Sequence, residues 1–226
     1  MATGTNGWIV PYGTHTYAGA SAVLTVRSSS VCPSDSTSAN YATGNLGNFV
    51  YAYTMVATAD ASAWSQSGYF RSYGTPLIHM AQQKWPDGSL HDNFCLICGT
   101  LSAGETHKYW QQASPGGGDC ACMHANVDQT QFIVSPTNSL SSWLLAGPLS
   151  PQFDGETRYR ESDMPGSSSQ SALFTQMSVQ SRYDFVFGPA PCFSATDLTA
   201  GNDNVARWAS AAVSCTNPTA GRIWTK

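Results

Sequence analysis

Apolar and polar residues along this chain follow mainly the two-residue period of β-strands. Residues 49–57 (FVYAYTMVA) form an aromatic and β-branched run with almost no polar position. Such a run is too apolar for one exposed face, so it predicts a central strand buried on both sides. Residues 172–180 and 182–187 alternate polar with apolar side chains instead, which predicts strands with one exposed face.

Turn residues separate the β-prone segments at short intervals. Gly74-Thr75-Pro76 lies between residues 64–73 and 77–83, which predicts a hairpin, whereas residues 85–99 show no periodicity and are predicted to form a loop. Further short strands are expected at residues 7–10, 22–27, 106–112, 129–134 and 143–145. Helical spacing is confined to residues 204–213, which predicts one short helix there.

These elements predict an all-β fold. We expect an antiparallel double-sheet β-sandwich of the jelly-roll or concanavalin-like type, with at most one short helix. The chain has 226 residues, no internal repeat and no linker, so residues 1–226 are expected to form a single domain. The polar segment 1–48 is then expected to supply strands and loops that pack on the same core.

Charge is sparse and nearly balanced. Only 11% of the residues are charged, and the formal net charge is −4, so no electrostatic attraction to nucleic acid or anionic lipid is expected. No apolar run approaches the roughly 18 residues of a membrane-spanning helix. We expect a secreted monomer in which Met1 is an added start codon replacing a removed signal peptide; a native cytosolic start is the alternative.

Seven cysteines fit a secreted protein with disulfide bonds. Four are clustered, as Cys95-Leu-Ile-Cys98 and Cys120-Ala-Cys122, and two neighbouring segments of this kind can be cross-linked twice. A second reading has these four cysteines bind zinc, helped by the nearby histidines His91, His107 and His124, although a Cys-x-Cys arm is atypical of structural zinc sites. We predict disulfides, no metal and no cofactor. A bond between Cys192 and Cys215 that leaves Cys32 over is one of the pairings that the sequence permits, and the connectivity itself stays open.

Carboxylates are the main candidates for chemistry. A Gly-x-Ser-x-Gly nucleophile motif is absent, and Gly116-Gly117-Gly118 is interpreted as a turn. Acidic residues gather after residue 153, interleaved with arginines: Asp154, Glu156, Arg158, Arg160, Glu161 and Asp163. By composition alone this cluster is typical of a solvated strand whose charges neutralise one another.

Two motifs change that interpretation. Phe153-Asp-Gly-Glu156-Thr, followed by Pro165-Gly166 and the strand-like residues 172–180, resembles the C-terminal motif of the neprosin-type glutamic peptidases, in which Gly-Gly-Glu-Val carries a catalytic glutamate. Gln66-Ser-Gly-Tyr69, followed by Tyr73-Gly74 and residues 77–78, resembles the Glu-Ala-Gly-Trp segment that carries the second catalytic residue of that family. The resemblance covers roughly residues 48–186.

The resemblance implies a catalytic pair with one substitution. Gln66 stands where neprosins have glutamate, but a Gln and Glu pair is used by the related fungal peptidases called eqolisins. Glu156 would then activate a water for attack on a peptide bond, and Gln66 would stabilise the oxyanion. Because a free glutamate titrates near pH 4.3, we expect an optimum below about pH 6. Aromatic residues that either line the polypeptide-binding cleft or pack in the core are Trp64, Tyr69, Tyr73, Trp85 and Tyr159.

Two other functions remain open on the sequence. The first is a polysaccharide lyase or glycosidase on the same sandwich, with Tyr69, Arg71, His79 or Glu156 in an aromatic groove. A glycosidase normally needs two facing carboxylates, and the matched motifs supply one. The second is a non-catalytic binding module in which Gln66 marks the loss of an ancestral activity.

Overall fold

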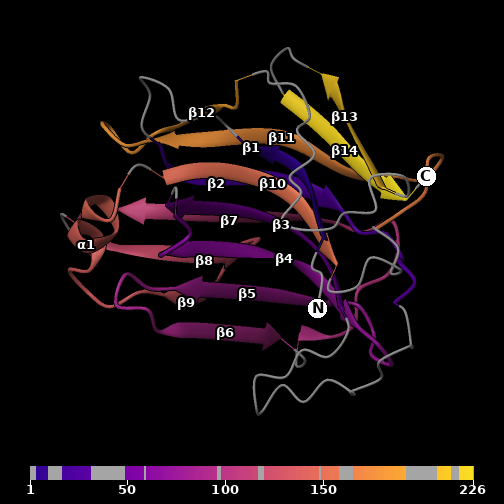
Figure 1. Ribbon diagram of the computed structural model, residues 1–226, viewed down its shortest axis with the longest axis horizontal. Coiled ribbons are helices and arrows are strands. Elements are labelled where there is room, and N and C mark those ends of the chain that lie inside the picture. The colour runs from indigo at the N-terminus through magenta and orange to yellow at the C-terminus, as the bar shows by residue number, and fades with distance from the viewer. Residues whose placement is uncertain are drawn as a thin grey trace.

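In the computed structural model, the chain forms two packed layers of antiparallel strands (Figure 1). The structure describes residues 4–9, 17–31, 49–58, 60–95, 98–116, 120–147, 149–157, 165–191, 208–214 and 219–225. Most strands run nearly along the long axis of the view, β13 (Trp208–Ser214) and β14 (Thr219–Thr225) cross it obliquely, and α1 (Leu140–Leu145) lies at one end of the strands. The predicted antiparallel β-sandwich is therefore confirmed.

The first layer, which we call the cleft sheet, has the order β1, β10, β3, β4, β5, β6. These strands comprise Gly4–Ile9, Leu149–Thr157, Phe49–Thr58, Trp64–Ser72, Ile78–Lys84 and Leu90–Cys95. The second layer, the back sheet, has the order β13, β14, β11, β2, β7, β8, β9, and β12 pairs with β11. Its strands comprise Trp208–Ser214, Thr219–Thr225, Ala172–Ser181, Tyr17–Thr25, Thr106–Ser114, Cys122–Val127 and Thr130–Val134, with β12 at Phe187–Pro189. The sheets join where Leu149 of β10 pairs with Tyr17 of β2.

Strand β3 is buried on both faces, as its apolar run predicts. Its residues Ala52 and Val56 belong to the main core between the two sheets, together with Tyr109 and Met123 of the back sheet. The alternate residues of β3 face away from that core and contribute to a separate aromatic cluster of Tyr51, Tyr53, Phe70, Ile78 and Met80. The cleft sheet therefore has an apolar surface on the side that does not contact the back sheet.

The predicted hairpin is also confirmed, whereas residues 90–95 correct the prediction of a loop. Strands β4 and β5 pair in antiparallel register, and Gly74 in the turn between them has a φ of 74°, which glycine adopts at little cost. Residues Leu90–Cys95 pair with β5 as β6. Their sequence shows no apolar alternation because most of β6 is at the exposed edge of the sheet.

The helix lies elsewhere than predicted. Residues 208–214, which overlap the segment with helical spacing, form β13 and pair with β14, while residues 204–207 lie outside the described part. The helix is α1, in a segment where 143–145 were expected to be β-prone. It buries Leu140 and Trp143, which are three residues apart and so share one helical face. Pairing along a sheet edge thus overrode the local helical pattern at residues 208–214.

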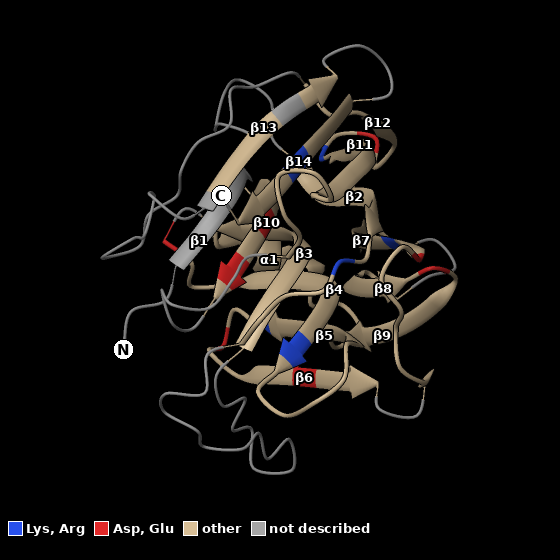
Figure 2. Cartoon of the chain, turned by 90° about the vertical axis from the view of Figure 1, so that its right-hand side faces the viewer, with Lys and Arg blue, Asp and Glu red and all other residues tan. Residues whose placement is uncertain are grey.

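Charged residues are few along the strands, and most of the cartoon in Figure 2 carries neither sign. Within the described part of the chain, no helix is long and apolar enough to cross a membrane.

Candidate active site

The register of three strands places Gln66 and Glu156 on the same face of the cleft sheet. Gln66 of β4 lies opposite Met55 of β3, and Glu156 of β10 lies opposite Tyr51 of the same strand. Since cross-strand partners point to the same face and side chains alternate along a strand, all four share the face that bears the aromatic cluster. Tyr53, midway between Tyr51 and Met55, lies between the two predicted catalytic residues.

Both predicted catalytic residues line one cavity of about 280 Å³ on this face. Its walls are largely apolar, and the polar groups within it come from Tyr51, Tyr53, Gln66, Gln82 and Glu156. The remaining lining residues are Phe49, Met55, Ala61, Trp64, Phe70 and Met80. We call this cavity the Glu156 cleft; among its described lining residues Glu156 is the one acid.

The environment of Glu156 favours the protonated carboxyl. Its side chain is half-buried and receives a hydrogen bond from the Tyr53 hydroxyl. Burial raises the pKa of Glu156 to about 7, because the surrounding protein replaces the water that would solvate the carboxylate, and the Tyr53 hydrogen bond opposes this effect in part. A carboxyl that titrates near neutrality can both accept and return a proton, as general acid–base catalysis requires.

Gln66 is held in one orientation by its neighbour. Its Nε2 donates to Oε1 of Gln82 at 2.7 Å, and Nε2 of Gln82 donates to Oδ1 of Asp92 at 2.6 Å. Burial raises the pKa of Asp92, and the hydrogen bond from Gln82 opposes that shift. Because an amide nitrogen carries two hydrogens, Gln66 retains one N–H and its oxygen for a ligand in the cleft.

Tyr51 supplies a further donor that the sequence did not reveal. Its hydroxyl is buried and forms no hydrogen bond within the described part of the chain, and burial raises its pKa well above the ordinary value, with Glu156 adding to the shift. Tyr51 and Tyr53 were missed because residues 49–57 were interpreted only as core. Asp92 was missed because residues 85–99 were predicted to form a loop, and Gln82 because no motif includes it. The available signal was the pair of tyrosines spaced two apart, since they must share a face.

Gly68 allows the strands to approach each other closely at this site. A Cβ atom at Gly68 would collide with the backbone carbonyl oxygen of Ala52. Gly68 is the cross-strand partner of Tyr53, and the added Cβ atom would also lie only 2.7 Å from the Cα atom of Tyr53. The Gln66-Ser67-Gly68 motif therefore has a structural reason for its glycine.

The structure separates the predicted substrate-binding aromatics. Trp64 lines the Glu156 cleft, but Tyr69 points to the opposite face, where it is 1% exposed and donates to the carbonyl oxygen of Thr25. Trp85 stacks on His91 and lines a different cavity. Tyr73 is half-buried outside the cleft lining, and Tyr159 lies outside the described residues. Of the five residues, we retain Trp64 as a candidate for substrate contact.

The described cysteines form disulfides within each pair, not between the two segments. Cys95 bonds to Cys98 and Cys120 bonds to Cys122. His124 Nε2 lies 3.4 and 3.2 Å from the sulfurs of Cys120 and Cys122, which makes this trio the one grouping of metal-binding residue types in the described part of the chain. Because both sulfurs are in a disulfide and Cys95 and Cys98 are not in the group, the four-cysteine zinc site is not formed. Cys32, Cys192 and Cys215 lie outside the described residues.

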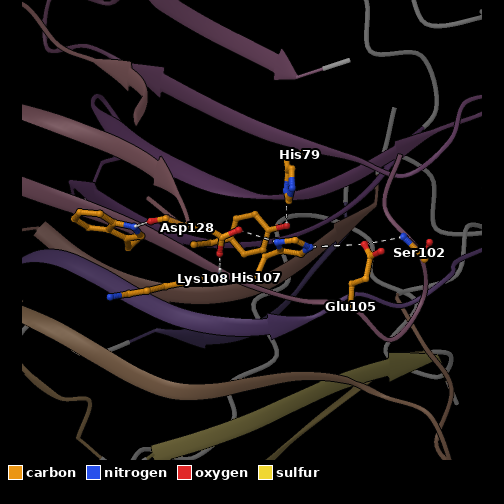
Figure 3. A network of polar contacts seen from close by, with 8 residues as sticks. His79, Ser102, Glu105, His107, Lys108 and Asp128 are labelled. Carbon is orange, nitrogen blue, oxygen red and sulfur yellow. Dashed lines mark hydrogen bonds and ion pairs between the residues drawn. The ribbon is translucent and has the colours of Figure 1, made fainter. Parts of the chain in front are cut away.

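A separate polar network surrounds His79 at the edge of the core between the sheets (Figure 3). His79 Nδ1 is 2.9 Å from the Tyr109 hydroxyl, and its ring meets that of His107 edge-on. His107 in turn contacts Asp128 at 2.8 Å and Glu105 at 3.7 Å. His79 therefore does not line the Glu156 cleft. The two residues do not form the shared aromatic groove that the carbohydrate-active alternative would need.

This network predicts that acid destabilises the fold. Burial lowers the pKa of His79 to about 4, and His107 adds to the shift. In the unfolded chain His79 titrates near pH 6.5, so between pH 6.5 and 4 the unfolded state binds a proton that the folded state does not. The free energy of unfolding should fall by about 3 kcal/mol across that window. Urea denaturation should show a smaller fall in His79→Asn; an equal fall would contradict this assignment.

Comparisons with known proteins identify the fold. No protein-family model matches the sequence, and no curated protein matches it. Solved structures of glutamic peptidases do match: a scytalido-glutamic peptidase with a transition-state analogue inhibitor has 15% identity and a TM-score of 0.56. The same peptidase with a peptide-based transition-state analogue has 15% identity and a TM-score of 0.54. SCP-B, an eqolisin-family peptidase in complex with the tripeptide Ala-Ile-His, has 13% identity and a TM-score of 0.50.

Each match covers 100% of this chain and 98% of the other. At this level of identity the likeness establishes a shared fold, and the chain has the fold of the glutamic peptidases.

Proposed function

We propose that this protein is a glutamic endopeptidase whose catalytic pair is Glu156 and Gln66. The observation that supports this proposal most strongly is that two residues 90 positions apart in the sequence line one cleft, on a fold shared with glutamic peptidases. The apolar and aromatic lining suits an extended polypeptide, whose side chains would occupy the space beside Phe70 and Trp64. The reaction is hydrolysis of a peptide bond.

In the proposed mechanism Glu156 transfers a proton from the attacking water to the amide nitrogen of the scissile bond. As a carboxylate it takes a proton from water while the water oxygen bonds to the scissile carbonyl carbon, and the carbonyl oxygen becomes an oxyanion. Glu156 then gives that proton to the amide nitrogen as the carbon–nitrogen bond breaks. The products are a carboxylic acid and an amine, and Glu156 returns to its carboxylate form.

Gln66 stabilises the tetrahedral intermediate in this proposal. Its second N–H, which does not bond to Gln82, donates to the oxyanion, and its oxygen orients the attacking water. The buried Tyr51 hydroxyl is available as an additional donor on the same face. Donors fixed before the reaction are effective because no reorganisation is needed when the charge develops.

The pKa of Glu156 changes the pH dependence that was expected from the sequence. An optimum below about pH 6 followed from the pKa of a free glutamate. With a pKa of about 7, Glu156 is mostly protonated below neutrality and cannot act as the base. We therefore expect kcat/KM to rise with pH, with a midpoint near 7. A profile that peaks near pH 4 and falls toward 7 would contradict the base role and indicate that the protonated carboxyl is the active form.

Several finer features are part of the same proposal. Its neprosin-type character is supported by the motifs around Gln66 and Glu156, and its Gln and Glu pair is of the eqolisin kind. Secretion is supported by the disulfides Cys95–Cys98 and Cys120–Cys122, which persist in oxidising compartments. We further propose that residues 1–226 form one monomeric domain without metal or cofactor, and without a nucleic-acid or membrane partner.

Incubation with casein tests the function directly. The proposal predicts new amino termini at pH 8, far fewer at pH 4, and their loss at pH 8 in Glu156→Gln. Release of reducing or unsaturated sugars from polysaccharides, with casein intact, would favour the carbohydrate-active alternative. That alternative has less support, because a glycosidase needs two carboxylates across the bond and the described cleft lining holds one. No product from either substrate would favour a binding module.

A further inference from the structure

A second cavity of about 320 Å³ lies at the other side of β4 and shares no lining residue with the Glu156 cleft. It is polar, and its lining comprises two arginines, four serines, a glutamine, an alanine and a glycine: Arg27, Ser28, Ser29, Ser30, Arg71, Ala103, Gly166, Ser167 and Gln170. Arg71 follows Phe70 on β4, so the two side chains point to opposite faces. This cavity holds two of the ten Lys and Arg residues in the protein.

Both arginines are anchored by backbone carbonyls and not by acids. Arg71 donates from Nη1 to the Ser29 oxygen at 2.8 Å and from Nε to the Thr75 oxygen at 3.2 Å. Arg27 donates from Nε to the Ser171 oxygen at 3.2 Å. The ion pairs found among the described residues both involve His107, so neither arginine has a described carboxylate partner. A guanidinium has five N–H groups, and each arginine therefore retains donors for a ligand.

Ser29 provides an independent indication that this cavity binds a ligand. Its side-chain oxygen is buried, the residue is 7% exposed, and this oxygen has no hydrogen-bond partner among the described residues. A buried hydroxyl without a partner costs about 1–3 kcal/mol, so such groups are usually paired. A ligand oxygen in the cavity would both satisfy Ser29 and offset the two half-buried positive charges.

We propose that this cavity binds a tetrahedral oxyanion, namely a phosphate or sulfate group. Two guanidiniums exclude a cation as the ligand. Arg27, Arg71 and Ser29 all line this one cavity, and a carboxylate offers only two oxygens to accept from their donors. A phosphate or sulfate offers three or four, and the cavity has room for the organic group to which it is attached. This inference does not depend on the peptidase activity.

Isothermal titration calorimetry at constant ionic strength tests the proposal with inorganic phosphate, sulfate and acetate. We expect saturable binding of phosphate or sulfate with a Kd below about 10 mM, and binding of acetate that is at least tenfold weaker. Titration with O-phosphoserine distinguishes a free ion from a pendant group, since tighter binding than phosphate indicates that the rest of the cavity contributes.

Three variants and one matched control locate the binding. Arg71→Gln and Arg27→Gln should each weaken phosphate binding at least tenfold, which corresponds to about 1.4 kcal/mol. Arg222→Gln is the matched control: it removes the same charge, but Arg222 lies over the Trp224 ring outside the cavity, so binding should be unchanged. Ser29→Ala should weaken binding severalfold without lowering the melting temperature in the absence of phosphate, because the lost hydroxyl has no described protein partner.

The proposal is overturned if neither phosphate nor sulfate shows saturable binding, or if Arg222→Gln weakens it as much as Arg71→Gln does. If Arg71→Gln does not fold, Arg71→Lys and Ser29→Ala replace it in the titration. Arg71→Lys keeps the positive charge but loses the planar guanidinium, so it should still weaken phosphate binding.

Discussion

Glu156→Gln should lower kcat/KM on casein-derived peptides by on the order of 10²–10⁴-fold at pH 8, the range that a general acid–base residue contributes. The amide has nearly the shape of the carboxylate, but it cannot take a proton from water. Because the carboxylate form is disfavoured by burial, the same change should raise the free energy of unfolding at pH 8 by about 1–2 kcal/mol. Loss of activity together with a gain of stability would exclude unfolding as the cause.

Glu105→Gln is the matched control for this experiment. It makes the same chemical change at an exposed acid that contacts Ser102 and His107, away from the cleft. Its activity should stay within about twofold of the parent. Equal losses in Glu105→Gln and Glu156→Gln, or full activity in Glu156→Gln, would contradict the assignment of Glu156 as the base.

Gln66→Ala should lower kcat by about 10²–10³-fold with a smaller change in KM, since a donor to the oxyanion acts mainly in the transition state. Initial rates of peptide hydrolysis, measured from low to saturating substrate concentration, give the separate changes in kcat and KM. Gln152→Ala is a suitable control, because Gln152 is on the same face of the cleft sheet but does not line the cleft. Its kcat should not change.

Gln66→Glu separates loss of the donor from loss of packing. Two carboxyls in one cleft would raise the pKa of one of them, and the protonated partner could still donate to the oxyanion. We expect partial recovery relative to Gln66→Ala, with the maximum at lower pH than in the parent. No recovery at any pH would indicate that the position needs the amide, or that Gln66 has only a structural role.

Strands were predictable from the sequence where the local pattern of apolar and polar side chains determines them. Residues 49–57 had no polar face, and a strand buried on both sides is the outcome. The segment at 208–214 was mispredicted because its pairing with β14 is a long-range property that local spacing does not encode. For the same reason the edge strand β6 was missed.

The candidate site was likewise predictable only where local sequence motifs identify its residues. Gln66 and Glu156 were named from short motifs, and the register of β3, β4 and β10 then places them on one face. The contacts of Gln66 with Gln82, and of Glu156 with Tyr53, depend on which residues lie opposite each other across strands, and no motif carries that information. The pairing of Cys95 and Cys120 was open for an equivalent reason, because sequence spacing alone permits several connectivities.

The most direct test is a crystal structure of the protein with a peptide that carries a tetrahedral mimic of the hydrated peptide bond. Our account predicts that one oxygen of the mimic lies within about 3.2 Å of a Glu156 carboxylate oxygen while the mimic also accepts a hydrogen bond from Gln66 Nε2. A mimic that binds outside this cleft, or that contacts Glu156 while Gln66 remains bonded only to Gln82, would contradict it.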